Sequence, residues 1–395
     1  MFSSRFHFDL TLNRLMETLQ AKRAAGVEVL DLAESNPTRA GFDYAAADIL
    51  SALTQPQAML YEPTPRGLPV ARLAITNYYL QRNKTIHPDS LFLTASTSEA
   101  YGHLFKLLAD PGDEVLVPKP SYPLLDFLTA LDSVRPIQYP TTYNSKLGWR
   151  IDTETLPDLI TDKTKAIVVV SPNNPTGSYL KTNELAQLNA LCAKNNLALI
   201  VDEVFSDYRY QSAADQVETA VGNEGALTFV LSGLSKIIGL PQVKLGWIQV
   251  SGPASLVAET QSRLEFIADT YLSVATPVQH AAERLLAQRQ AMQKQIIARL
   301  DDNHRFLEAQ CAKLPNCRPL LREGGWYAVL EIDDDGAQVS DDERVQQLLE
   351  QDNIFVHPGY FYDFDQDGIL VLSLLTPPAI FQAGVSKILA HIRMI

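Results

Sequence analysis

The chain has 395 residues, of which 46% are hydrophobic and 20% are charged, and this composition excludes a disordered protein. Its formal net charge of -13 argues against a nucleic-acid partner, which would require a basic face. A chain of this length exceeds one ordinary core, so we expect two domains or one large α/β unit.

The cysteine content and the N-terminal segment indicate in which cellular compartment the protein is expected. Cys192, Cys311 and Cys317 are a sparse, odd-numbered set with no disulfide framework and no metal-ligand spacing. The N-terminal segment MFSSRFHFDL lacks the long apolar stretch of a signal peptide. The longest apolar runs are too short to cross a bilayer. We therefore expect a cytoplasmic protein with no metal and no membrane partner.

The pattern of apolar residues predicts an alternation of helices and strands. A helix is expected near residues 10–25, and later helices at 99–109, 122–131 and 183–194. The predicted strands are residues 91–94, 114–117, 166–170, 197–201, 227–231 and 245–250. Several strands are apolar at almost every position, as in a sheet that is buried on both faces. The order predicts an α/β fold with a mostly parallel sheet flanked by helices.

The C-terminal third differs from the middle of the chain. Residues 277–314 have the pattern of one long or kinked amphipathic helix. Strand-like segments follow at 326–332, 354–357 and 370–374, with helices at 341–350 and at the end. These segments predict a smaller α+β unit. We expect residues 44–280 to form a large domain, and residues 1–43 and 281–395 to form a small domain.

Turn-rich segments follow several of the predicted strands. They are TASTSEA (94–100), KPSYP (119–123), SPNNPTG (171–177), VDEVF (201–205) and SGLSK (232–236). Ligands of an open parallel α/β sheet bind at the carboxyl ends of its strands. The placement of these segments therefore predicts one shared site.

Each segment also has a structural alternative. Lys236 could form a Schiff base if its pKa were depressed, but most lysines are exposed. Asp202 could pair with a ring nitrogen, bind a metal or cap a helix. Asn174 could donate to a ligand or close an Asx turn.

The remaining two segments are open to the same kind of alternatives. Thr97 and Ser98 leave backbone N–H groups at a helix N-terminus, which suits a phosphate, although Ser96 and Glu99 could form an ordinary cap there. Tyr122 could stack on a planar ring or belong to the core.

The order of the segments resembles the fold type I PLP-dependent aminotransferases of class I/II, the aspartate aminotransferase-like group. The resemblance is carried by YEPTPRGLPVAR (61–72), DPGDEVLVPKPSYP (110–123), SPNNPTG (171–177), DEVF (202–205), SKIIGLPQVKLGW (235–247) and EGGWYAVLEI (323–332). It spans most of the chain and implies pyridoxal 5′-phosphate (PLP) as the cofactor.

The resemblance implies a role for each matching residue. Lys236 would hold PLP as a Schiff base and move a proton during the reaction, and Asp202 would pair with the pyridinium nitrogen. Asn174 would donate to the ring O3′, and Tyr122 would stack on the pyridine. The phosphate would be bound by Thr97, Ser98, Ser235, Lys244 and Tyr61. Tyr61 would come from the neighbouring subunit, which implies a homodimer with shared sites.

The chain departs from the family pattern at three positions. Lys244 stands where most members have arginine, which keeps the charge but loses the bidentate fork. Phe205 stands where a tyrosine usually donates to O3′, so we expect a raised imine pKa relative to Phe205→Tyr. Val371 stands where the family has the arginine that binds the substrate α-carboxylate. No arginine lies between Gly359 and Gln382.

The loss of the arginine at position 371 implies either a substitute cation, such as Arg39 or Arg322, or an unusual substrate. The resemblance favours an aminotransferase acting on an amino donor and a keto-acid acceptor. The alternative on the same fold is a PLP-dependent lyase that performs β-elimination, like a C–S lyase. A non-catalytic scaffold would not need Lys236, Asp202 and Asn174. A nucleotide-dependent enzyme lacks its glycine-rich motif here.

Overall fold

The computed structural model describes residues 1–6, 8, 11–333 and 339–394. Its largest sheet has eight strands. They are β2 (Leu91–Thr94), β3 (Glu114–Lys119), β4 (Arg135–Asn144), β5 (Gly148–Ile151), β6 (Thr164–Val170), β7 (Ala198–Asp202), β8 (Thr228–Gly233) and β9 (Gly246–Ser251). Their order across the sheet is β2-β9-β8-β7-β6-β3-β4-β5.

The mostly parallel character predicted for this sheet is confirmed. Neighbouring strands from β4 through β3, β6 and β7 to β8 pair in parallel, whereas β9 and β5 join antiparallel. The strands β4 and β5 were not predicted. The sequence of β4 contains Pro136 and Pro140, which argue against a central strand because proline cannot donate to a ladder. Both prolines lie where β4 pairs only with β3.

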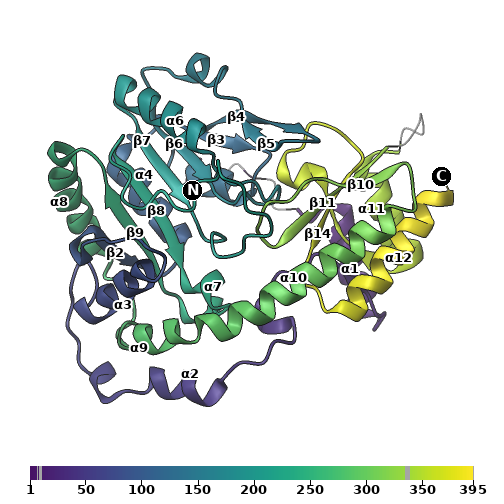
Figure 1. The fold of residues 1–395 in the computed structure, drawn as a ribbon, viewed down its shortest axis with the longest axis horizontal. Coiled ribbons are helices and arrows are strands. Elements are labelled where there is room, and N and C mark those ends of the chain that lie inside the picture. Colours follow the sequence, from purple (N-terminus) through teal and green to yellow (C-terminus); the bar gives the residue numbers. More distant parts are fainter. Residues whose placement is uncertain (7, 9–10, 334–338, 395) are drawn as a thin grey trace.

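Helices cover both faces of the large sheet (Figure 1). They are α3 (Pro69–Leu80), α4 (Thr97–Leu108), α5 (Leu124–Leu131), α6 (Thr182–Asn195), α8 (Ala254–Tyr271) and α9 (Thr276–Ala287), and α2 (Ala46–Leu53) packs on α9. Strand β7 illustrates the burial of both faces. Its Leu199 packs into the core that α3 and α9 share, whereas its Ile200 packs into the core under α4 and α8. The absence of alternation in the strand sequences has this cause.

A second sheet of four strands has the order β10-β11-β14-β13. Its strands, β10 (Cys317–Pro319), β11 (Tyr327–Ile332), β13 (His357–Pro358) and β14 (Ile369–Ser373), are antiparallel. The helices around it are α1 (Arg14–Ala24), α10 (Arg289–Cys311), α11 (Asp341–Asp352) and α12 (Pro378–Met394). Two short strands, β1 (Leu30–Asp31) and β12 (Ile354–Phe355), pair in parallel.

The predicted long helix at 277–314 is in fact two helices. Gln288 separates α9 from α10, and α10 extends from the region under the large sheet toward α12 beside the small sheet (Figure 1). The predicted N-terminal helix is confirmed as α1, with Leu19 packed in the same core as α10 and α12. Leu10, at the start of that prediction, lies outside the described residues.

Short elements complete the chain. One is α7 (Leu234–Ile237), and the 3₁₀ turns are Pro37–Arg39, Pro56–Met59, Pro88–Ser90, Leu156–Leu159, Pro241–Val243 and Gly359–Tyr362. Within the residues that the structure describes, no helix is both long and apolar enough to cross a bilayer. The same part of the chain contains no group of three or more His, Cys, Asp or Glu side chains suited to a metal ion.

Candidate active site

A pocket of about 410 Å³ lies between the carboxyl ends of the parallel strands and the four-stranded sheet. All predicted site residues except Tyr61 line it. They are Thr97, Ser98, Tyr122, Asn174, Asp202, Ser235, Lys236 and Lys244. Lys244 precedes β9, and the other residues lie at or after the ends of β2, β3, β6, β7 and β8. The structure therefore brings the five predicted segments together at one pocket.

Lys236 lies in α7, directly after β8. Its Nζ is 4.8 Å from the centre of the Trp326 ring and 5.5 Å from that of Phe205. The side chain keeps some surface open toward the pocket, but protein surrounds its other sides. Desolvation lowers the pKa of Lys236 to about 8, although the nearby Asp202 carboxylate raises it. A lysine in this state has a larger neutral fraction near physiological pH than an exposed lysine has.

Asp202 is the last residue of β7 and is buried. Its Oδ1 accepts a hydrogen bond from Val204 N at 3.1 Å. Burial raises the pKa of Asp202 to about 6, while the Val204 bond, the Tyr101 hydroxyl and Lys236 lower it. Tyr101 was missed by the sequence analysis. It lies one turn into α4, where a single aromatic residue in a helix gives no sign that it faces a ligand.

The N-terminus of α4 forms one end of the pocket. Ser96 is its N-cap and accepts from Glu99 N at 3.2 Å, and Glu99 in turn accepts from Ala95 N at 2.7 Å. The capping alternative is therefore correct for Ser96 and Glu99. Thr97 and Ser98 still line the pocket, and first-turn backbone N–H groups have no acceptor inside a helix. The binding of a phosphate by Thr97 and Ser98 stays a prediction, with which this cap is compatible.

Asn174 and Tyr122 line the same pocket as Asp202. Asn174 is buried, and its Oδ1 has no hydrogen-bond partner among the described residues. A buried amide oxygen without a partner indicates a position that a ligand completes. Tyr122 is 44% exposed, so the alternative that it belongs to the core is wrong. Its ring is available to a planar ligand.

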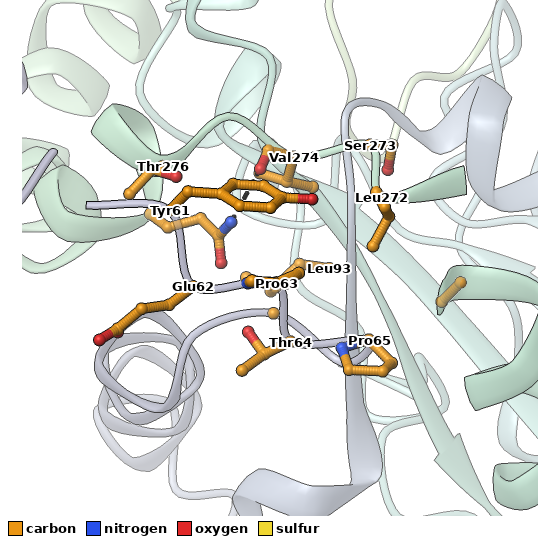
Figure 2. A pocket seen from close by; sticks show the side chains of 13 residues that line it. Tyr61, Glu62, Pro63, Thr64, Pro65, Leu93, Leu272, Ser273, Val274 and Thr276 are labelled. Carbon is orange, nitrogen blue, oxygen red and sulfur yellow. Dashed lines mark hydrogen bonds between the residues drawn. The ribbon is translucent and has the colours of Figure 1, made fainter. Parts of the chain in front are cut away.

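Tyr61 lies outside this pocket. Figure 2 shows its ring beside Leu272 and Val274, in a separate surface pocket that shares no lining residue with the one at Lys236. The side chain is 73% exposed. Tyr61 therefore does not contribute to the site of its own chain.

The departures from the family pattern have clear positions. Phe205 lines the pocket and packs edge-on against Trp326, with ring centres 5.3 Å apart. Val371 is buried in β14, in register with Val329 of β11 and His357 of β13. Lys244 also lines the pocket and lies directly after the 3₁₀ turn Pro241–Val243.

Neither arginine suggested as a substitute cation lines the pocket. Arg39 is exposed in the 3₁₀ turn Pro37–Arg39. Arg322 is buried and donates to the carbonyl oxygens of Gly324 at 3.1 Å and Gly325 at 2.7 Å. Arg322 therefore organises its own loop. Four further residues line the pocket and were not predicted as site residues from the sequence. They are Ser35, Tyr327, His357 and Tyr362.

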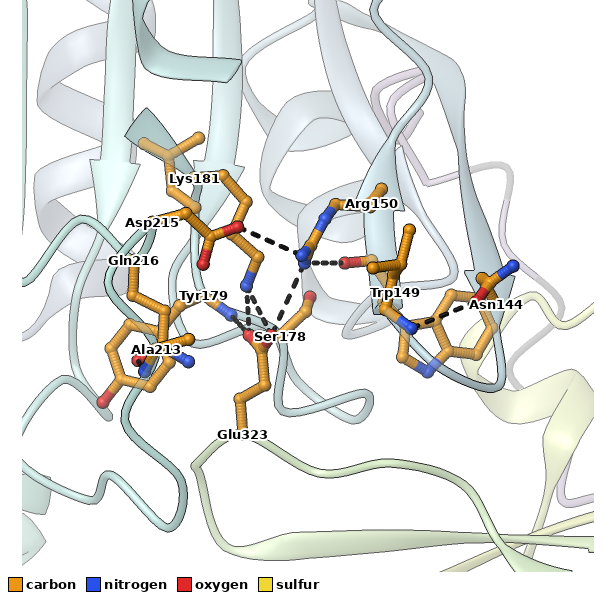
Figure 3. Close-up of polar contacts among 12 residues, drawn as sticks. Asn144, Trp149, Arg150, Ser178, Tyr179, Lys181, Ala213, Asp215, Gln216 and Glu323 are labelled. Carbon is orange, nitrogen blue, oxygen red and sulfur yellow. Dashed lines mark hydrogen bonds and ion pairs between the residues drawn. The ribbon is translucent and has the colours of Figure 1, made fainter. Parts of the chain in front are cut away.

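A buried ion cluster fixes the loop that carries Trp326. Glu323 forms ion pairs with the ammonium group of Lys181 and, at 3.5 Å, with the guanidinium of Arg150 (Figure 3). Its carboxylate also accepts a hydrogen bond from Tyr179 N at 2.7 Å. Lys181 is fully buried, and Arg150 also reaches Asp215 at 3.2 Å. The cluster attaches the segment before β11 to the loop after β6. It thereby holds Trp326 over Lys236.

Comparison with known proteins decides the family. The family model described as "Aminotransferase class I and II" matches residues 27–377. The chain belongs to this family. The resemblance in the sequence motifs is thus confirmed over most of the chain.

Relatives of this aminotransferase agree with the assignment. Alanine aminotransferase of Mycobacterium tuberculosis is 29% identical over 343 residues, which cover 85% of this chain and 79% of the relative. Glutamate-pyruvate aminotransferase AlaA of Escherichia coli is 27% identical over 352 residues, 87% of this chain and 86% of the relative. The solved structure of an alanine aminotransferase from Pyrococcus furiosus has a TM-score of 0.89 at 24% identity and covers 100% of both chains, which shows a common fold.

The enzyme is a PLP-dependent transaminase that moves an amino group between an amino compound and a keto acid. These comparisons give the lyase alternative no support. The residues in the pocket fit the cofactor. The lowered pKa of Lys236 suits an aldehyde, and the buried carboxylate of Asp202 suits a ring nitrogen. The amide NH2 of Asn174 suits a ring oxygen, and the N-terminus of α4 suits a phosphate.

Proposed function

We propose that Lys236 carries PLP covalently as a Schiff base and moves the proton during transamination. PLP, when bound, withdraws electrons from the substrate carbon that bears the nitrogen. Nζ of Lys236, as a free amine, can take the proton from that carbon and return it to another. The observation that carries the proposal is the lowering of the Lys236 pKa to about 8 in the pocket, beside Asp202.

We assign Asp202 and Asn174 to the ring of the cofactor. Asp202 ends β7 inside the pocket, and a carboxylate there would keep a pyridine nitrogen protonated. Asn174 would donate through its amide to the ring oxygen. Tyr122 would stack on the ring, for which its exposed face is suited.

The phosphate of the cofactor would be held at the N-terminus of α4. Thr97 and Ser98 would donate backbone and hydroxyl groups, and the helix dipole favours an anion there. Ser235 and Lys244 would add a hydroxyl and a positive charge. Lys244 supplies that charge as a point, without the bidentate geometry of arginine.

We infer a homodimer in which Tyr61 of one subunit completes the phosphate site of the other. Tyr61 is highly exposed and remote from its own pocket. Leu60, the residue before it, and Leu272, which lines the same pocket, are exposed as well. An exposed apolar patch of this kind suits an interface between protein chains.

We also propose two domains and a cytoplasmic location. Residues 44–280 would form the large PLP-binding domain, and residues 1–43 and 281–395 the small one. The division is supported by a hydrophobic core around the four-stranded sheet, to which the large domain adds Trp149, Phe205 and Tyr208. The location is supported by the three free cysteine thiols, which suit a reducing compartment.

Spectroscopy of the purified enzyme tests the central assignment. We expect a yellow protein whose visible band is bleached by borohydride, with the reduced cofactor attached to the peptide that contains Lys236. An amino donor should remove the band, and a keto acid should restore it. A protein that stays colourless in excess PLP, or a label on another lysine, would refute the proposal.

A further inference from the structure

The charged groups of the active-site pocket lie at its cofactor end. Among the described residues that line the pocket, the side chains of the types Asp, Glu, Lys and Arg are Asp202, Lys236 and Lys244. All three belong to the large sheet or to the loops at its strand ends. The opposite wall consists of Ser35, Tyr327, His357 and Tyr362, which we call the substrate end.

The substrate end is electrically neutral. Burial lowers the pKa of His357 to about 4, so its imidazole is uncharged at neutral pH. Burial raises the pKa of Tyr327 to about 12, and it also raises the pKa of Tyr362 well above the ordinary value. These hydroxyl groups therefore remain protonated. The wall offers hydrogen bonds without a cation.

The register of the small sheet explains why no cationic side chain of the described residues lies in this wall. His357, Val371 and Val329 are direct partners on neighbouring strands, so their side chains share one face of the sheet. Tyr327 lies two residues before Val329 and belongs to the same face. Since His357 and Tyr327 both line the pocket, this face is turned toward it. Val371 lies on the strand between them with an apolar side chain.

The imidazole of His357 is held in place. Its Nδ1 is 3.0 Å from the hydroxyl of Tyr362, and its ring packs against Phe355 and Phe361 with centres 5.5 Å and 5.4 Å apart. With Nδ1 bonded to Tyr362, Nε2 is the nitrogen that remains for a ligand. A fixed neutral group of this kind distinguishes ligands by hydrogen bonding.

A carboxylate and a neutral group differ in the cost of entering such a wall. An ion that leaves water without a countercharge loses far more solvation than an amide or a hydroxyl does. We propose that the substrate end recognises an uncharged polar group, an amide or an alcohol, on the carbon that bears the amino group, and that His357 determines this specificity. The inference rests on the proposed function of Lys236 and names the substrate class of the same site.

Three donors that differ in one group test the inference. L-alanine, L-alaninamide and L-alaninol share the amine and the methyl group, and each is mixed with the holoenzyme while the loss of the visible band is followed. We expect kcat/KM for the better neutral donor to exceed that for L-alanine by about tenfold or more. A wild-type enzyme that prefers L-alanine to both neutral donors would overturn the inference.

Two substitutions separate the recognition of the group from the reactivity of the donors. Val371→Arg adds a cation to the face of the sheet that borders the pocket, and it should shift the ratio of kcat/KM toward L-alanine by about tenfold or more. His357→Leu should raise KM for the preferred neutral donor, and His357→Gln should restore it in part. An unchanged KM in a folded His357→Leu enzyme would overturn the role of His357. If Val371→Arg does not fold, the wild-type comparison and the His357 pair decide.

The outcomes distinguish this inference from the proposed function. If borohydride attaches PLP to Lys236 and L-alanine is the best donor, the proposed function stands and the inference fails. If none of the three donors removes the visible band, the inference fails. If the protein stays colourless in excess PLP, or borohydride attaches PLP to another lysine, the proposed function fails and the inference falls with it.

Discussion

Lys236 Nζ lies 4.8 Å from the centre of the Trp326 ring, although Lys236 follows β8 of the large sheet and Trp326 precedes β11 of the small sheet. Trp326 is fully buried directly before β11, and Glu323 fixes this segment through Lys181 and Arg150. The reactive amine is thereby enclosed between the strand ends of the large sheet and the small sheet. This enclosure lowers the pKa of Lys236. Because the ion pairs of Glu323 hold the segment that carries Trp326, they help to maintain the enclosure of the amine.

Lys236→Ala should still bind PLP through the phosphate groups and Asp202, but its turnover should fall by many orders of magnitude. The substitution removes both the covalent anchor and the group that moves the proton. Steady-state assays and PLP retention after dialysis measure the two effects. Lys119→Ala is a matched control, since Lys119 also ends a strand of the sheet but pairs with Asp365 outside the pocket. Full turnover in Lys236→Ala would contradict the mechanism.

Reconstitution of the cofactor-free enzyme with PLP should depend on pH with a midpoint of about 8. Only the neutral amine attacks the aldehyde, so the rate should fall about tenfold per pH unit below the pKa of Lys236 and level off above it. Stopped-flow absorbance from pH 6 to 9.5 measures the profile. Asp202→Asn should move the midpoint lower, because the carboxylate raises the pKa of Lys236. A midpoint near the ordinary lysine value would contradict the enclosure of the amine.

Phe205→Tyr should lower the pH midpoint of the visible band of the holoenzyme. A tyrosine hydroxyl at this position would donate to the ring oxygen of the cofactor and stabilise its anionic form, which Phe205 cannot do. Phe205 lines the pocket, so the new hydroxyl has access to the ligand. A spectrophotometric pH titration of both proteins measures the shift. Identical midpoints would show that residue 205 does not contact the ring oxygen.

Lys181→Met should destabilise the enzyme by about 3 kcal/mol, because it leaves the buried Glu323 carboxylate with only Arg150 as an ion-pair partner. The midpoint of thermal unfolding measures the effect. The control is Arg263→Met, which removes an exposed pair with Glu259 on α8 and should cost at most about 0.5 kcal/mol. Equal losses in both variants would contradict a special role of the buried pair.

Mixed dimers should test the assignment of Tyr61 across the interface. Tyr61→Phe weakens the phosphate site, and Lys236→Ala removes the amine. A dimer with one chain of each kind contains one site with both native residues, so co-expression should recover activity well above that of either variant alone. Activity of the purified mixture, compared with the two parents mixed without exchange, measures the recovery. No recovery in confirmed mixed dimers would place Tyr61 elsewhere.

The sequence was sufficient to predict six of the eight strands of the large sheet and several pocket residues at their ends. Strands buried on both faces are apolar throughout, and short polar turns mark their carboxyl ends, so local pattern located Asn174, Asp202 and Lys236. The strand β4 was missed because Pro136 and Pro140 are permitted only where one side of the strand has no partner. That condition depends on neighbours, which the pattern of one segment does not contain.

The substrate end was decided by the tertiary structure. Ser35, Tyr327, His357 and Tyr362 come from separate segments that meet only when the small sheet packs against the large one. The sequence determined that position 371 is valine and that no arginine follows nearby. Only the register of β11, β14 and β13 placed a neutral histidine beside that valine. The sequence gives the charge of each side chain. The solvation and the neighbours of that charge depend on contacts between segments that are distant in the sequence.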